Sequence, residues 1–413
     1  MPIGTWWIDF DIRVPPAVGS HFECPNHEIH QNHEITGGPE DCDICASASR
    51  IGMQMSQSDH ERMAAKFEGQ VMKEKIRARA PLRLGLAGGG TDLSPYCDMY
   101  GGATLNVTID RFAFATILPA DRAVIRFVAD DMGIVEEFAL DAPLGDSKLV
   151  LHRGVYERMI LEFGGNKRMP LTIATTVDAP AGSGLGSSSA LVVAMVEAFR
   201  ALLGAPLGLY DIARLAFEIE RIDLGLAGGR QDQYAAAFGG MNFIEYLADG
   251  RVIVNPLRLH TGVRNEIETS LVTCFTGQSR ESASIITEQV KGMAGASGKT
   301  INALHKLKVD AVDMKAAALA GDIDKMACIL SESWLAKRAT ATAVTNQHID
   351  EMLKFGMSQG ALAGKVSGAG GGGFIFFLVH PENRYRLITA LTGRGAVAGP
   401  VKIIEQGCEV WRI

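Results

Sequence analysis

The sequence lacks the features that mark membrane, secreted and nucleic-acid-binding proteins. No apolar run approaches the roughly 18 residues that a helix needs to span a bilayer, and no basic segment followed by an apolar one opens the chain. Acidic residues outnumber basic ones, 47 to 40, so a basic surplus for nucleic acid is missing. The seven cysteines are widely scattered, which favours free thiols. These absences predict a cytoplasmic protein without membrane or nucleic-acid partners. They are compatible with a homo-oligomer.

Two common nucleotide-binding motifs are missing as well. Residues 180–190 read Pro-Ala-Gly-Ser-Gly-Leu-Gly-Ser-Ser-Ser-Ala, without the lysine of a P-loop or the glycine spacing of a dinucleotide fold. The alternating glycines let backbone N–H groups converge, and a helix that begins at the serines favours an anion. A flexible linker is the alternative interpretation. We predict an ATP phosphate site that comprises Gly182, Gly184, Leu185, Gly186, Ser187, Ser188 and Ser189.

The pattern along the rest of the chain predicts mixed helices and strands. Period-2 or β-rich stretches favour strands at 77–86, 103–118, 171–177, 241–246 and 374–379. Helical patterns span 147–163, with Asp146 or Ser147 as the N-cap, and 190–203, 210–224, 280–293, 300–320, 322–338 and 347–359. The irregular order of these elements indicates an α+β fold. No fixed-period repeat is present.

The first 70 residues differ from the rest of the chain in composition. They hold five of the ten histidines and three of the seven cysteines, with little sustained periodicity. Cys24, His27, Cys42 and Cys45 have the chemistry of a zinc site, in two close pairs. Chance clustering in a leader is the alternative. We treat 1–70 as an N-terminal extension of unknown structure.

Three glycine-rich segments together resemble the signatures of the GHMP kinases. Residues 180–190 resemble the second signature, 80–92 (Ala-Pro-Leu-Arg-Leu-Gly-Leu-Ala-Gly-Gly-Gly-Thr-Asp) resemble the first, and 365–373 (Lys-Val-Ser-Gly-Ala-Gly-Gly-Gly-Gly) the third. The resemblance covers about 75–413. It implies a two-lobed α+β kinase with ATP and substrate in a cleft between an N-terminal domain, 71–257, and a C-terminal domain, 258–413.

The resemblance also implies roles for four residues in phosphoryl transfer. Asp232 matches the catalytic aspartate of sugar-kinase members, and Arg83 stands where related enzymes place a cation near the transferred phosphate. Ser188 and Glu220 match the residues that hold Mg²⁺, which prefers hard oxygen ligands. Glu218 is the alternative to Glu220. The purely structural alternatives are a helix-capping role for Asp232 and a solvated helix face for Glu220.

Substrate-binding residues are implied in the same way. Asp92, with Thr91, matches an aspartate that hydrogen-bonds sugar hydroxyls, and Gly89 and Gly90 replace the Glu-His of galactokinases, which leaves a roomier pocket. Gly370 and Gly371 allow close backbone approach. Arg280 is a candidate for a phosphate already on the substrate, because arginine binds phosphate in a bidentate manner.

Within the superfamily, the sequence is most similar to the D-glycero-D-manno-heptose 7-phosphate kinases. The segments that carry this similarity are 83–92, 231–240 and 276–280. They imply phosphorylation of the anomeric hydroxyl of a heptose phosphate, with heptose 1,7-bisphosphate as the product, a precursor of nucleotide-heptose for surface polysaccharide. Another sugar 1-kinase, such as a fucokinase, is the enzymatic alternative, and a sensor that binds sugar and ATP without turnover is the non-enzymatic one.

Overall fold

The computed structural model describes residues 74–413 except 121, 279–281 and 295–297. The described residues belong to one compact unit, Met55–Ile413. The candidate zinc ligands Cys24, His27, Cys42 and Cys45 lie outside the described residues, and so does Arg280. Their roles stay predictions.

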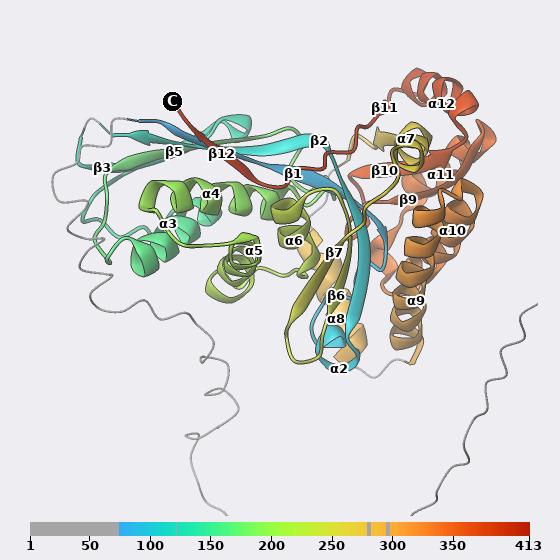
Figure 1. Ribbon diagram of the computed structural model, residues 1–413, viewed down its shortest axis with the longest axis horizontal. Helices are drawn as coiled ribbons and strands as arrows, with labels where there is room; N and C mark the ends of the chain where they lie inside the picture. Colours follow the sequence, from blue (N-terminus) through green and yellow to red (C-terminus); the bar gives the residue numbers. More distant parts are fainter. Residues whose placement is uncertain (1–73, 121, 279–281, 295–297) are drawn as a thin grey trace, which may run out of the picture. The chain divides into compact units, whose positions relative to one another are not determined.

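Two long antiparallel strands form the centre of the larger sheet. β1 (Ile76–Ala87) pairs with β2 (Gly102–Pro119) along nearly its whole length. The other side of β2 pairs first with β6 (Met241–Tyr246) and then with β5 (Leu171–Val177). In Figure 1, β2 therefore runs from the wide part of the sheet down into the β6–β7 hairpin. This bend brings the loop after β1 close to the start of β2.

The sheet is completed by strands from both ends of the described chain. β3 (Val124–Ala129) pairs with β5 and with β4 (Ile134–Ala139), and β7 (Val252–Pro256) pairs with β6. The C-terminal strand β12 (Glu409–Arg412) returns to pair with β1. The end of the chain thus joins the sheet of its first half, and the domain division at 257/258 stays a prediction.

A layer of helices packs on one face of this sheet (Figure 1). α4 (Ser187–Leu203) contacts both β1 and β2. Its apolar side chains are buried because the helix is covered on its other sides by α3 (Val150–Phe163), α5 (Leu209–Glu218) and α6 (Gln231–Phe238). A π-helical turn, Ile219–Asp223, follows α5 directly. The phosphate-loop candidate therefore opens the most deeply buried helix of this layer.

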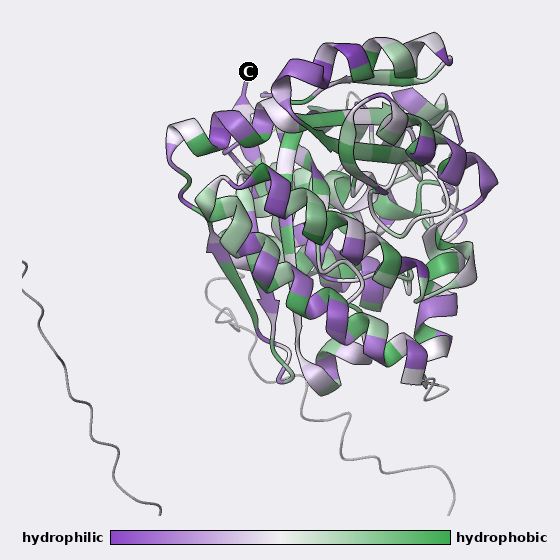
Figure 2. Ribbon diagram, turned by 90° about the vertical axis from the view of Figure 1, so that its right-hand side faces the viewer, coloured by the Kyte–Doolittle hydropathy of each residue, from purple (hydrophilic) through white to green (hydrophobic). Residues whose placement is uncertain are grey.

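The second sheet is smaller and consists, in the described part, of four antiparallel strands. Their order is β11 (Val397–Pro400), β8 (Leu271–Phe275), β10 (Phe374–Val379), β9 (Ala361–Val366). Every residue of β10 is buried. Figure 2 shows apolar strands behind helices that alternate between polar and apolar residues. These helices are α9 (Gly298–Ala320), α10 (Ile323–Arg338), α11 (Gln347–Ser358) and α12 (Pro381–Gly393).

The remaining described helices are short or peripheral. They are α2 (Tyr96–Tyr100), α7 (Thr261–Ser270), α8 (Ser282–Ala294) and two 3₁₀ turns, Asp130–Met132 and Thr342–Val344. Among the helices that the structure describes, none combines the length and apolarity needed to span a membrane.

Most of the expected elements are confirmed, and the differences have local causes. The helix expected from 147 begins only at Val150, with Leu149 at the N-cap; Ser147 precedes it, donates its hydroxyl to Glu136 and accepts the Leu149 N–H. The helix expected over 210–224 is α-helical only to Glu218 and then widens into the π turn. Asp322 caps α10 by accepting a hydrogen bond from the Lys325 N–H, as its position at the helix start predicts.

Candidate active site

The phosphate-loop candidate is held against the third glycine-rich segment by backbone contacts. Gly184 has φ 77°, and a Cβ there would lie 2.4 Å from the Ser367 carbonyl oxygen. Gly373 has φ 82°, and its Cβ would lie 2.2 Å from the Ser183 carbonyl oxygen, to which Phe374 N–H donates at 2.9 Å. Only glycine permits such an approach of two main chains. The second and third sequence motifs therefore form one loop pair.

The loop leads straight into helix α4. Gly186 is the N-cap residue in the left-handed conformation, and no side chain caps the helix. Ser187, Ser188 and Ser189 form the first turn, whose N–H groups have no partners earlier in the helix. Leu185 is fully buried, and its carbonyl accepts a hydrogen bond from Arg83 N–H. The loop is thus anchored to β1 while the helix terminus stays open to an anion.

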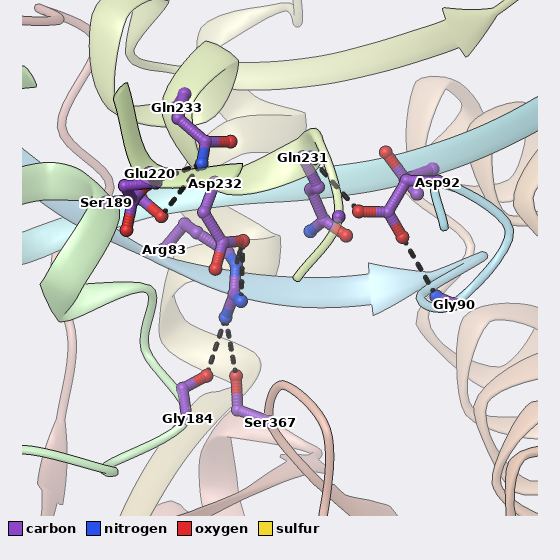
Figure 3. A network of polar contacts seen from close by, with 12 residues as sticks. Arg83, Gly90, Asp92, Gly184, Ser189, Glu220, Gln231, Asp232, Gln233 and Ser367 are labelled. Carbon is purple, nitrogen blue, oxygen red and sulfur yellow. Dashed lines mark hydrogen bonds and ion pairs between the residues drawn. The ribbon is translucent and has the colours of Figure 1, made fainter. Parts of the chain in front are cut away.

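An arginine–carboxylate pair lies at the junction of β1, α6 and the phosphate loop (Figure 3). Arg83, which is 6% exposed, donates from Nε to Asp232 Oδ1 at 2.8 Å, and its Nη2 forms an ion-pair contact with the same oxygen at 2.7 Å. Its Nη1 donates to the Gly184 carbonyl and to Ser367 Oγ. Asp232 Oδ2 faces Gly186, where a Cβ would lie 3.2 Å away. One oxygen of Asp232 therefore binds the arginine, and the other lies beside the phosphate loop.

Glu220 faces Ser188 from the π turn. Ser188 Oγ donates to Glu220 Oε1 at 2.9 Å, and the buried Gln233 donates to Oε2 at 2.6 Å. Glu218 lies in a different environment, paired with Arg158 at 2.7 Å and Arg214 at 3.3 Å. The geometry thus favours Glu220 over its rival as a partner of Ser188.

The loop after β1 carries the candidate sugar-binding carboxylate. Asp92 accepts hydrogen bonds from Gly90 N–H and from Gln231 N–H, both at 3.1 Å (Figure 3). A Cβ at Gly229 would lie 1.9 Å from Asp92 Oδ2, so this close packing requires glycine. Thr91 is fully buried, and its hydroxyl donates to backbone carbonyls of Gly88 and Ala103. Thr91 holds the loop to β2, and its substrate role stays a prediction.

Two lysines that the sequence did not single out line the same pocket. Lys337, in the last turn of α10, donates to the Gly89 carbonyl at 3.0 Å. Lys365, on β9, is the first residue of the third glycine-rich segment. Burial lowers the pKa of Lys337 to about 8, with Arg83 adding repulsion and Asp92 opposing the shift. Burial, followed by repulsion from Lys337 and Arg83, lowers the pKa of Lys365 to about 7.

The pocket is built by both halves of the chain. Residues from before and after position 257 meet there. Its described lining comprises Arg83, Gly85, Gly89, Gly90, Asp92, Leu93, Gly229, Gln231, Asp232, Ile286, Gln289, Lys337, Lys365, Gly368 and Ala369.

Most predicted site residues meet at or beside this pocket, and two of the predicted glycines pack elsewhere. A Cβ at Gly370 would lie 2.5 Å from the Val344 carbonyl oxygen, and Gly371 N–H donates to the same carbonyl. Their neighbours Gly368 and Ala369 line the pocket instead. The substrate contacts expected of Gly370 and Gly371 stay predictions. The one sequence signal that could have found Lys365 is its place as the first residue of the third glycine-rich segment.

Comparisons with known proteins agree with this architecture. The model of the GHMP kinases N terminal domain matches residues 150–240, and that of the GHMP kinases C terminal domain matches 314–397. A D-glycero-alpha-D-manno-heptose 7-phosphate kinase of Campylobacter jejuni is 43% identical over 339 residues, which is 82% of this chain and 99% of the relative. A crystal structure described as a D-glycero-D-manno-heptose 1-phosphate kinase, from Bacteroides thetaiotaomicron, is 40% identical with a TM-score of 0.69, covering 82% of this chain and 99% of that one.

A fucokinase is a more distant relative. The bifunctional fucokinase/GDP-fucose pyrophosphorylase of Arabidopsis thaliana is 26% identical over 373 residues, which is 85% of this chain but 34% of the relative.

Proposed function

This chain belongs to the GHMP kinase family, and we propose that it transfers the γ-phosphate of ATP to the anomeric hydroxyl of D-glycero-D-manno-heptose 7-phosphate. The product is heptose 1,7-bisphosphate, and its expected use is the synthesis of nucleotide-heptose for surface polysaccharide, in the cytoplasm. The substrate follows from the identity of 43% to a heptose 7-phosphate kinase. The fucokinase relative, at 26% identity, supports the alternative sugar less well.

The observation that carries the proposal is the position of Asp232. Its Oδ1 is held by Arg83, and its Oδ2 lies beside Gly186 at the start of the phosphate loop. A hydroxyl bound next to Oδ2 would lie between a carboxylate that accepts its proton and a loop that binds phosphate. Phosphoryl transfer needs this juxtaposition of acceptor, base and phosphate.

Residues of this chain can accept the proton and stabilise the charge in the transfer step. The anomeric oxygen attacks the γ-phosphorus of ATP as its proton passes to Asp232, and the bond from the γ-phosphorus to the bridging oxygen breaks to release ADP. Arg83 keeps the carboxylate in place with a hydrogen bond and an ion-pair contact, and its positive charge stabilises the negative charge that develops on the transferred group. The N–H groups at the start of α4 bind the phosphates of ATP.

The oxygens of Ser188 and Glu220 fit a divalent cation, and we propose Mg²⁺. They are 2.9 Å apart, one hydroxyl and one fully buried carboxylate. Mg²⁺ is usually held by one or two protein oxygens together with substrate phosphates, so a two-residue site is sufficient. The cation would neutralise phosphate charge, and Gln233 would keep Glu220 oriented through its hydrogen bond to Oε2.

The test is ADP release from Mg-ATP with a panel of acceptors: heptose 7-phosphate, unphosphorylated heptose, fucose, galactose and mevalonate. We expect efficient turnover with heptose 7-phosphate and weak or no turnover with the others. Efficient turnover of fucose would replace the substrate and keep the kinase. Binding of ATP and heptose 7-phosphate by calorimetry, without turnover of any acceptor, would instead support the sensor.

A further inference from the structure

Two buried ammonium groups face the pocket without a carboxylate partner. Lys337 and Lys365 are each 5% exposed. Lys337 donates to one backbone carbonyl, that of Gly89, and Lys365 has no hydrogen-bond partner among the described residues. Asp310, the carboxylate that acts on Lys365, is already bonded to Lys306. Buried charges in proteins are normally paired, because desolvating an unpaired one is costly.

The charges that line the pocket leave a positive surplus. Arg83, Lys337 and Lys365 are its three cationic side chains, and Asp92 and Asp232 are its two anionic ones in the described lining. Arg83 is paired with Asp232. Asp92 is bonded to two backbone N–H groups and acts on Lys337 from a distance. The pocket therefore favours an anion beside its two lysines.

The side of the pocket on which Lys337 lies is separate from the site expected for ATP. Figure 3 shows Glu220 and Ser189 on one side of the Arg83–Asp232 pair, and Asp92 and Gly90 on the other. Lys337 belongs to the second side, because it donates to the Gly89 carbonyl and its Nζ would lie 3.1 Å from a Cβ at Gly90. An acceptor whose reacting hydroxyl lies at Asp232 would extend from there toward Lys337. ATP would approach Asp232 from the opposite direction, along the phosphate loop.

We propose that Lys337 and Lys365 bind the phosphate group that the sugar carries before the reaction, and so select phosphorylated over unphosphorylated sugars. The inference rests on the proposed function for the identity of the sugar. A phosphate dianion would supply the missing counter-charge, and charge-assisted hydrogen bonds to it are stronger than neutral ones. Gly90 contributes by leaving room for the Lys337 ammonium group, and Gly89 contributes the carbonyl that it binds.

The test compares Lys337→Met and Lys365→Met with Lys354→Met, whose lysine is exposed on α11. Methionine keeps a long flexible side chain and removes the charge. For the two pocket variants we expect the KM for heptose 7-phosphate to rise about 10- to 100-fold, while the KM for ATP changes less than about twofold. The kcat/KM for unphosphorylated heptose should stay near the wild-type value, so the preference for the phosphorylated sugar disappears. Lys354→Met should behave as the wild type.

Three outcomes separate this inference from the function on which it rests. Equal losses with phosphorylated and unphosphorylated heptose, or a rise in the KM for ATP alone, would overturn the lysine assignment and leave the kinase intact. The latter result would assign the lysines to the γ-phosphate of ATP. If the wild type turns over no heptose, the proposed function fails. Calorimetry with heptose 7-phosphate then tests the lysine assignment separately. Wild-type binding that is lost in both methionine variants supports the assignment, and wild-type binding that is absent, or that is unchanged in the variants, overturns it.

The fold of each variant is checked by thermal unfolding. Removing an unpaired buried charge should leave Tm unchanged or raise it, whereas a merely structural lysine would lower Tm on removal. A variant that does unfold is replaced by Lys337→Arg or Lys365→Arg, which keeps the charge and should retain a preference for the phosphorylated sugar.

Discussion

The guanidinium of Arg83 and the carboxylate of Asp232, 149 positions apart in the chain, meet at 2.7 Å through a single carboxylate oxygen. Because the hydrogen bond from Nε and the ion-pair contact of Nη2 both use Oδ1, Oδ2 remains available beside Gly186. A pair bonded through both oxygens would have left no acceptor for a substrate proton. This one-sided geometry makes Asp232 a base candidate as well as an ion-pair partner.

Asp232→Asn should abolish most turnover while leaving ATP binding intact. The amide keeps the size of the side chain but cannot accept the proton, so we expect kcat to fall about 10²- to 10⁴-fold. The measurement is ADP release at saturating substrates, with the ATP dissociation constant from calorimetry. Asp131→Asn, at an exposed position, is the control. A wild-type kcat in Asp232→Asn would remove Asp232 from its catalytic role.

Glu220→Gln should weaken the response to Mg²⁺ specifically. A neutral amide is a poorer ligand for Mg²⁺ than a carboxylate, so the Mg²⁺ concentration for half-maximal rate should rise about tenfold or more, with partial recovery at high Mg²⁺. Glu218→Gln is the matched control, because Glu218 lies nearby on α5 but pairs with Arg158 and Arg214. An equal shift in both variants would contradict the assignment of Glu220.

Gly184→Ala should disrupt the contact between the two glycine-rich loops. The added Cβ would meet the Ser367 carbonyl at 2.4 Å, at a backbone φ of 77°. We expect destabilisation of about 1–3 kcal/mol, seen as a lower Tm, together with a higher KM for ATP. Gly145→Ala meets no heavy atom within 4 Å and should leave both quantities near wild type. An unaltered Tm in Gly184→Ala would show that the loops separate without cost.

The KM for the sugar phosphate should depend on pH through Lys365. Its pKa in the free protein is lowered to about 7 by burial and by repulsion from Lys337 and Arg83. A bound phosphate favours the charged lysine, so affinity should fall as pH rises above about 7. Below about pH 6 the phosphate becomes a monoanion, and affinity should fall again. A KM profile between pH 5.5 and 9 measures both limbs, and the alkaline limb should flatten in Lys365→Met.

Stability should respond to pH in the same range with a defined sign. The pKa of Lys365 is lower in the folded than in the unfolded protein, so the unfolded state binds more protons between about pH 7 and the ordinary lysine value of about 10.4. The contribution of Lys365 to the free energy of unfolding of the wild type therefore becomes more favourable as pH rises above 7. The Tm difference between Lys365→Met and wild type should be largest at pH 6.5 and shrink by pH 9. A constant difference would contradict the lowered pKa.

The sequence alone indicated where the backbone requires glycine and which segments form strands and helices. The three glycine-rich segments were recognisable because left-handed φ values and main-chain contacts, as at Gly184 and Gly373, exclude other residues. The strands β1, β2 and β10 and the helix α4 followed from periodicity, which reports which faces are buried. Asp232 and Arg83 were identified because the segments that contain them resemble those of GHMP kinases.

Tertiary packing decided the choices that residue type leaves open. Glu218 and Glu220 are chemically alike, and the turn of the helix after α5 decided which of them faces Ser188. Lys337 lay at the end of a predicted helix and Lys365 at the start of the third glycine-rich segment, and the structure shows that α10 and β9 bring both to the pocket. The sequence did not predict the pairing of β12 with β1 either. The physical reason is common to all three: contacts between distant segments depend on how buried surfaces fit together, and a periodic pattern records that a face is buried without recording what covers it.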